Sequence, residues 1–314
     1  MPVPPGRVFV VGNGIVGRRI GRMLVDVEAV AYDPRTEPAP AAEPGDVAVL
    51  AHPADHAPVA LEFVRRGASV ITVGDSVDDT RELLGLDHDV ASAGSTLVVG
   101  AGLTPGLSGL LARHLAVGMH TVDEIHVAVH GTAGPSCARD HHRSLSGRAV
   151  SWRDGQWRQS LGGGGRELCW FPEPVGALDC YHAEIAGPVL LHESFPDVQR
   201  IDARRSARRR DRFTARLPML SPPHREGDVG ALRVEVRGSE ASGARVTRVL
   251  GIAELVGTAT AATVSVFVAA VLAGQLPTGV VVTSDDRLDT LGLLRRIEAA
   301  GVRLQEFTGV PQPS

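Results

Sequence analysis

Three glycines near the start of the chain have the spacing of a phosphate-binding turn. The segment GNGIVG contains Gly12, Gly14 and Gly17, and it directly follows the apolar run RVFVVG. The first glycine permits a tight turn, the second lets the backbone approach a pyrophosphate, and the third allows a helix to pack closely on a strand. The spacing therefore predicts a dinucleotide site whose first contacts are Gly12, Asn13, Gly14, Ile15, Val16 and Gly17.

An acidic residue stands where such a site needs one. Asp33 comes 21 residues after Gly12, at the end of a second apolar run, where a carboxylate can bind the hydroxyls of an adenine ribose. A carboxylate repels a 2′-phosphate, whereas Arg35, two residues later, offers a cation to it. The sequence favours NAD as the cofactor and keeps NADP as the alternative. Further cofactor contacts are expected where later strands end, at His52, Pro53, Gly74, Gly102, Thr104, Pro105 and Gly106.

Groups that could exchange a proton or bind an anionic substrate are concentrated at 130–148. His141 and His142 are the candidate catalytic residues, because histidine titrates near neutral pH. Arginine binds carboxylates with paired hydrogen bonds, which makes a substrate-binding role the hypothesis for Arg139, Arg143 and Arg148. Adjacent histidines also occur in structural roles, and no second ligand cluster accompanies them, so no metal is expected.

Composition excludes several chemistries. All 32 basic residues are arginine, so the chain has no lysine for a Schiff base, a P-loop or proton abstraction. The three cysteines lack the C-x-x-C spacing of a zinc or redox site, and they suit a reducing, cytoplasmic location. The net charge of −4 indicates neither nucleic acid nor an anionic membrane as a partner.

The elements around the glycine turn alternate between strand and helix. Apolar runs at 7–12, 27–33, 46–52, 67–74 and 95–102 predict strands separated by helices, including one helix over 77–93. A further helix is expected to run to Gly118, with Thr104 as its N-cap and Pro105 as its first residue. This alternation is typical of an α/β fold, a doubly wound parallel sheet of the Rossmann type.

The pattern changes after residue 119. Residues 122–131 alternate strictly between apolar and polar, hairpin signals follow at Asp154-Gly155, and paired strands are expected at 230–238 and 244–252. These features predict an α+β domain on an antiparallel sheet over 120–252, inserted into a Rossmann domain formed by 1–119 plus 253–314. The uncharged stretch 255–276 is long enough for a bilayer, but its small residues favour a buried helix and no membrane span.

The densest basic run is RRSARRRDR, Arg204 to Arg212. Such a run usually forms a solvated surface. The alternative is a docking surface for an acidic partner protein.

Four segments resemble the saccharopine dehydrogenase-like family, of the saccharopine reductase type. They are VVGNGIVGRRI, VVGAGLTPGLSGLLARHL, FPEPVGALDCYHAEIAGPVLLHESFPDV and GTATAATVSVFVAAVLAGQLPTGVV. The resemblance implies a Rossmann domain with an inserted substrate-binding and dimerisation domain, hence a homodimer. It carries over to the glycine turn, Asp33 and the Gly102–Gly106 loop; the family often has an acidic residue at the position of Thr104.

The leading functional hypothesis is an NAD(P)-dependent oxidoreductase. The resemblance implies reduction of an imine, or oxidation of a secondary amine, in a small amino-acid-like substrate. One alternative is a dehydrogenase or reductase that acts on a C–O or C=C bond of a small metabolite. The other is a dinucleotide-binding scaffold that has lost catalysis.

Overall fold

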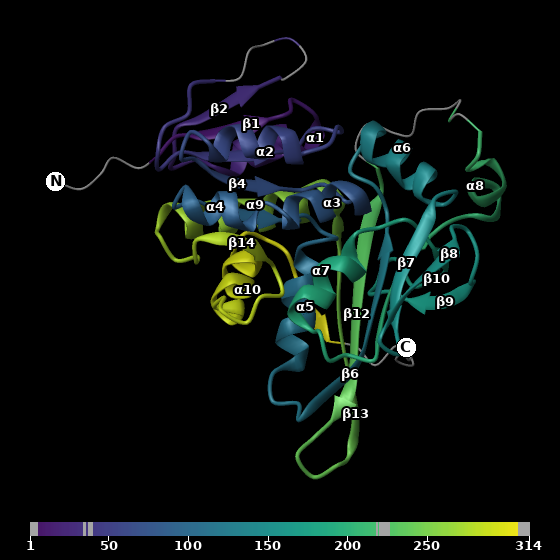
Figure 1. Ribbon diagram of the computed structural model, residues 1–314. Helices are drawn as coiled ribbons and strands as arrows, with labels where there is room; N and C mark the ends of the chain where they lie inside the picture. The colour runs from purple at the N-terminus through teal and green to yellow at the C-terminus, as the bar shows by residue number, and fades with distance from the viewer. Residues whose placement is uncertain (1–5, 34–35, 37–39, 218, 220–226, 307–314) are drawn as a thin grey trace.

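Six short strands form one parallel sheet (Figure 1). The computed structural model describes residues 6–33, 36, 40–217, 219 and 227–306. The strand order is β14-β5-β4-β3-β1-β2. All four residues of β1, β3 and β5 are buried, as expected for strands covered on both faces. The strands are β1 (Val8–Val11), β2 (Ala29–Tyr32), β3 (Val47–Leu50), β4 (Ser69–Thr72), β5 (Thr96–Val99) and β14 (Gly279–Val282).

Helices cover both faces of this sheet, so the predicted doubly wound α/β fold is confirmed. One face packs on α1 (Ile15–Met23), α5 (Leu107–Ala116), α9 (Val256–Leu272) and α10 (Thr290–Ala299). The other face packs on α2 (Ala57–Val64), α3 (Val77–Leu84) and α4 (Asp87–Ser92). The single helix predicted over 77–93 is wrong: α3 ends before Gly85, a poor helix former, and α4 starts two residues later.

A second sheet lies beside the first and is mostly antiparallel (Figure 1). Its main order is β15-β13-β12-β6-β11-β10-β9, and β7 pairs with both β11 and β8. One pair, β6 with β11, is parallel, because α6, β7 to β10 and α7 intervene between these strands in the chain. The strands are β6 (Thr121–His130), β7 (Arg148–Arg153), β8 (Gln156–Leu161), β9 (Glu167–Trp170), β10 (Ala177–His182), β11 (Arg200–Ser206), β12 (Val229–Ser239), β13 (Arg245–Leu255) and β15 (Gln305–Glu306).

Strand alternation decides which face of the second sheet is buried. In β6, Ile125, Val127 and Val129 belong to the same core as α5 and α9, as the period-2 pattern predicted. The opposite face is polar. Three helices connect the strands of this part of the chain: α6 (Pro135–Ser144), α7 (Gly187–Ser194) and α8 (Arg209–Thr214).

The uncharged stretch 255–276 forms α9, which is buried against the first sheet and α1. Arg19 of α1 donates to the Thr258 hydroxyl of α9 at 3.0 Å, which fixes the two helices together. Within the described residues, no helix combines the length and the apolar character needed to cross a bilayer. After α9 the chain adds β14 to the first sheet, and its last described strand, β15, pairs with β13 of the second sheet.

Candidate functional site at the carboxyl edge of the first sheet

Two glycines of the predicted turn are required by packing. Gly12 has φ of +121°, and a Cβ there would lie 2.6 Å from the Ala51 carbonyl oxygen. Gly17 lies in α1, where a Cβ would lie 1.8 Å from the Gly12 carbonyl oxygen. A larger residue at Gly12 would push the end of β1 away from the segment that follows β3, and a larger residue at Gly17 would push α1 away from the turn.

The middle glycine is different, because it faces open space. Gly14 is the N-cap of α1 with φ of −80°, and a Cβ there would have no neighbour within 4 Å. Asn13 and Gly14 are exposed, while Ile15 and Val16 are half-buried. No acidic residue stands in the first turn of α1, so its free N–H groups and dipole favour an anion. These residues fit the pyrophosphate of a dinucleotide.

Asp33 lies beside the glycine turn. It directly follows β2, and β2 pairs with β1 in parallel, with Tyr32 opposite Val11. The Gly12 N–H donates to the Tyr32 carbonyl oxygen at 2.8 Å, which joins the two strand ends. The half-buried Asp33 therefore stands where a ribose hydroxyl would lie. Arg35 lies outside the described residues.

Two histidines follow β3 at the same edge. Their rings meet edge-on with centroids 4.6 Å apart, and His56 Nε2 lies 3.0 Å from the His52 carbonyl oxygen. Burial, with His56 nearby, lowers the pKa of His52 to about 4, so its ring is neutral at pH 7. His52 Nε2 and His56 Nδ1 are buried and find no hydrogen-bond partner among the residues that the structure describes. Gly74 packs on the His56 ring, where a Cβ would lie 3.1 Å from Nδ1, and Pro53 is exposed.

Asp79 anchors this segment, and its replacement provides a stability prediction. Its carboxylate accepts the N–H groups of His56 and Ala57 at 2.8 and 2.9 Å. Asp79→Ala should lower the free energy of unfolding by about 1–3 kcal/mol, because two buried N–H groups lose their acceptor. Urea denaturation measures this, with Asp78→Ala as the matched control because the Asp78 side chain is 89% exposed. Equal losses in both variants would contradict the prediction.

A polar cluster joins the two sheets. Asp75 follows β4 at the carboxyl edge of the first sheet. Its carboxylate accepts the Ala186 N–H at 2.9 Å and pairs with the Arg205 guanidinium of β11 at 2.8 Å. Burial raises the pKa of Asp75 to about 6, although Arg205 opposes the shift. We call Asp75, Thr104, His141 and Arg205 the junction cluster.

Two other members of the junction cluster carry unsatisfied polar atoms. Within the described part of the chain, Thr104 Oγ1 and His141 Nδ1 are buried without a hydrogen-bond partner. Thr104 lies beside α7, since a Cβ on Gly187 would be 3.9 Å from its hydroxyl oxygen. Burial, with Arg205 adding to it, lowers the pKa of His141 to about 3, so its ring is neutral. Buried polar atoms without partners are a feature of ligand sites.

The loop that carries Thr104 differs from its prediction. Thr104 is not an N-cap: α5 begins at Leu107, and Gly106 is its N-cap with φ of +134°. The Gly102 N–H donates to the Pro105 carbonyl oxygen at 2.8 Å, which folds the loop back before any helical turn. A Cβ on Gly106 would lie 2.2 Å from the Gly102 carbonyl oxygen. This loop closes on itself, so it presents a buried hydroxyl instead of a helix N-terminus.

The histidines and arginines predicted at 130–148 separate in the structure. His141 enters the junction cluster. His142 Nε2 instead lies 2.9 Å from the Thr214 carbonyl oxygen, where it ties α6 to the end of α8. Among the three predicted substrate-binding arginines, Arg139 lies 3.5 Å from the Ser136 hydroxyl, Arg143 lies 3.5 Å from Asp140, and Arg148 donates to Gln159 at 3.3 Å; their binding of a substrate stays a prediction. No metal cluster of three or more His, Cys, Asp or Glu occurs among the described residues.

Sequence reasoning missed Arg205, because it lies inside the basic run. Ile201, Ala203 and Arg205 alternate along β11 and share its buried face, and this period of two is the signal that could have found it. Arg204 points to the opposite face, and Arg212 donates to the Gly163 carbonyl oxygen at 2.7 Å. Only Arg208, Arg209 and Arg210 remain exposed in a row, and docking of an acidic partner there stays a prediction.

The fold of this chain is similar to that of known protein structures. No family model and no curated protein sequence matches this chain. Apo saccharopine dehydrogenase (L-Glu forming) from Saccharomyces cerevisiae is similar in structure, with a TM-score of 0.66 and 14% identity over 96% of this chain and 100% of that chain. DAP dehydrogenase of C. glutamicum matches with a TM-score of 0.49 and 15% identity over 90% of this chain and 94% of that chain. The chain therefore has the fold of saccharopine dehydrogenase, as the resemblance implied.

Proposed function

We propose that this protein is an NAD(P)-dependent oxidoreductase that reduces an imine, or oxidises a secondary amine, in a small amino-acid-like substrate. The junction cluster carries the proposal. In open α/β sheets, ligands bind outside the carboxyl ends of the strands, and Asp75 and Thr104 follow β4 and β5 at that edge. The titratable Asp75 carboxyl pairs with the Arg205 guanidinium there and accepts the Ala186 N–H at the start of α7. The Thr104 hydroxyl, which has no hydrogen-bond partner among the described residues, lies beside Gly187 of the same helix.

Each group has a role in this proposal. A bound nicotinamide dinucleotide supplies or accepts the hydride. The open N-terminus of α1 binds the pyrophosphate, and Asp33 binds the adenine ribose. Asp75 exchanges the proton at its carboxyl oxygen, because a pKa of about 6 suits proton transfer near neutral pH. Arg205 keeps that carboxyl in place and adds positive charge for an anionic substrate group.

In this proposal Asp75 exchanges the proton, in place of His141 or His142. The His141 ring is neutral at pH 7 because its pKa is about 3, and the His142 Nε2 atom already lies 2.9 Å from the Thr214 carbonyl oxygen. The Thr104 hydroxyl supplies a hydrogen bond where the resembled family often has an acid. It has no hydrogen-bond partner among the described residues, so we assign it to a ligand.

Calorimetric titration with NADH and NADPH tests the cofactor assignment. NADH should bind at least about tenfold more tightly than NADPH, because Asp33 repels a 2′-phosphate. Asp33→Ser should reduce that preference. Calorimetry is preferable to emission quenching because Trp152, Trp157 and Trp170 all lie in the second sheet. Failure of both dinucleotides to bind would overturn the proposal.

Turnover assays separate the competing functions. Reductive amination with pairs of amines and keto acids supports the proposal. Activity confined to alcohols or C=C bonds favours the alternative reductase. Tight dinucleotide binding without turnover across the panel favours a scaffold. The homodimer that the resemblance implies stays a prediction.

A further inference from the structure

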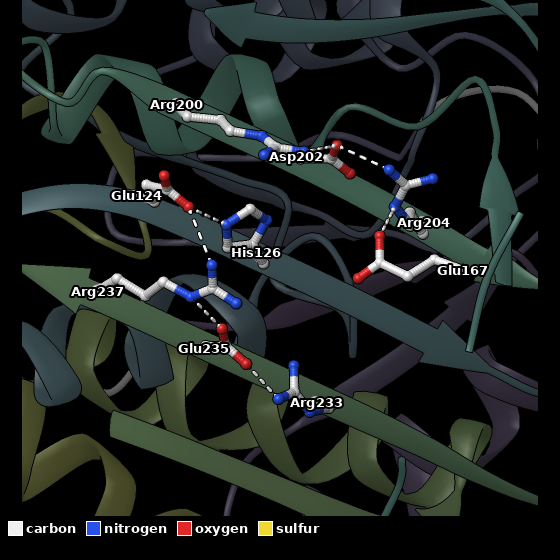
Figure 2. Close-up of polar contacts among 9 residues, drawn as sticks. All are labelled: Glu124, His126, Glu167, Arg200, Asp202, Arg204, Arg233, Glu235 and Arg237. Atoms are coloured by element: carbon white, nitrogen blue, oxygen red, sulfur yellow. Dashed lines mark hydrogen bonds and ion pairs between the residues drawn. The ribbon is translucent and has the colours of Figure 1, made fainter. Parts of the chain in front are cut away.

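The polar face of the second sheet, which points away from the first sheet, carries a dense set of charged side chains (Figure 2). Alternation in β6, β11 and β12 places eight of them on this one face, and Glu167 of β9 pairs there with Arg204. Acids and arginines are interleaved, and most are linked by ion pairs. The nine residues are Glu124, His126, Glu167, Arg200, Asp202, Arg204, Arg233, Glu235 and Arg237.

On the β6–β12 side of this face the charges neutralise one another. Glu235 is paired with both Arg233 and Arg237. Glu124 accepts from His126 at 2.8 Å and lies 3.4 Å from Arg237. The carboxylates here hold the neighbouring cations, so this side offers little net charge to a ligand.

The β7–β8 side is different, because cations outnumber acids there. A hollow of about 240 Å³ lies between the β7–β8 hairpin and β11. Four guanidinium groups line it against a single carboxylate, Asp202. Asp202 lies 3.3 Å from Arg200 and 3.2 Å from Arg204, and Arg204 also pairs with Glu167 at 2.8 Å. The lining residues are Ser151, Trp152, Arg153, Arg158, Ser160, His182, Arg200, Asp202 and Arg204.

Two of these arginines have no acidic partner. Within the described part of the chain, neither Arg153 nor Arg158 forms an ion pair with a carboxylate. They come from the two strands of one hairpin, β7 and β8, and both are exposed. Like charges brought together without a counter-ion repel each other, so an anion between them would relieve that repulsion.

We propose that this hollow binds a small phosphate-bearing ligand. Guanidinium groups match the oxygens of phosphates and carboxylates through paired hydrogen bonds. Arg200 and Arg204 are paired with acids. The donors for a ligand are therefore Arg153, Arg158 and the Ser151 hydroxyl, and their two positive charges exceed the single negative charge of a carboxylate. A phosphate group has three or four oxygens and up to two negative charges, which fits this set better.

The site is separate from the junction cluster. Arg204 and Arg205 are consecutive in β11, so their side chains leave opposite faces of the sheet. Arg205 faces Asp75, whereas Arg204 lines the hollow. A ligand in the hollow would therefore bind independently of the dinucleotide, and failure of either proposal leaves the other intact.

Titration with inorganic phosphate, in a phosphate-free buffer at constant ionic strength, tests the proposal. Calorimetry should show one saturable site, and emission should change because Trp152 lines the hollow. The variant R153S/R158S should bind at least about tenfold more weakly. The control R295S/R303S changes two exposed arginines away from the hollow and should bind as the wild type does. Denaturation curves check that both variants fold.

A parallel titration with glycerol 3-phosphate distinguishes the two sources of the phosphate group. Tighter binding of the ester than of inorganic phosphate assigns the site to a phosphorylated metabolite, and equal binding assigns it to free phosphate. The proposal is overturned if sodium chloride reproduces the response, if no saturable binding occurs, or if R153S/R158S binds phosphate as tightly as the wild type.

Discussion

Replacing Gly14 with valine should abolish dinucleotide binding and leave the fold intact. A Cβ at this position meets no atom within 4 Å, and φ of −80° is allowed for any residue. The free energy of unfolding should therefore fall by no more than about 1 kcal/mol, the cost of a poorer N-cap. The valine methyl groups would occupy the space into which the pyrophosphate must come. Calorimetry should show NADH binding weakened by at least about 100-fold, or roughly 2.7 kcal/mol.

The neighbouring glycine serves as the contrast. Gly17→Val should destabilise the whole protein, because its Cβ would lie 1.8 Å from the Gly12 carbonyl oxygen. Overpacking of this kind typically costs about 1–3 kcal/mol or more. The two variants thus separate a glycine required by a ligand from one required by packing. Unchanged NADH affinity in Gly14→Val would refute the assignment of the α1 N-terminus as the pyrophosphate site.

Asp75→Asn should lower kcat by about 100-fold or more, the usual contribution of a proton-transfer group. Asparagine has nearly the same shape, and its one carbonyl oxygen can keep one of the two hydrogen bonds that Asp75 accepts, at Oδ1 from the Ala186 N–H and at Oδ2 from Arg205. It cannot exchange a proton, so the rate should fall while NADH affinity stays within about threefold. Asp78→Asn, three residues away and exposed, is the control. Wild-type kcat in Asp75→Asn would remove Asp75 from the chemistry.

The stability of the wild type relative to Asp75→Asn should also depend on pH. Burial raises the pKa of Asp75 from 3.8 to about 6, so between these values the folded protein holds a proton that the unfolded chain has released. The wild type should therefore lose stability, relative to Asp75→Asn, as the pH rises from 4 to 6, and the difference should stay constant above that. The rise in the pKa of Asp75 corresponds to at most about 3 kcal/mol in the free energy of unfolding. The loss should be smaller than this limit because solvent screens the Asp75 side chain, which is 22% exposed. Urea denaturation at pH 4 to 7 measures it, and a difference that is flat or rises with pH would contradict the shift.

Local sequence determined the first half of the molecule well. Apolar runs predicted β1 to β5 of the parallel sheet but not β14; the signal is strongest in β1, β3 and β5, which are buried on both faces and must be continuous in hydrophobic character. The glycine turn and Asp33 were predictable because their spacing reflects a backbone turn and one helix, both local in the chain. The strict alternation in β6 is also local in the chain, and it predicted which face of this strand is buried.

The junction cluster was not predictable in this way, because its members are distant in sequence. Asp75 and Arg205 lie 130 residues apart and meet only because β11 packs its buried face toward the first sheet. On the same strand, the Arg204 side chain lies on the opposite face of the sheet. The basic run, which the sequence predicts to form one surface, is therefore divided between the junction cluster and the hollow. His141 and His142 are adjacent in the chain, yet one lies in the junction and the other binds α8. Residue types and local spacing set the cofactor turn, whereas the packing of two sheets decided which charged groups became buried together.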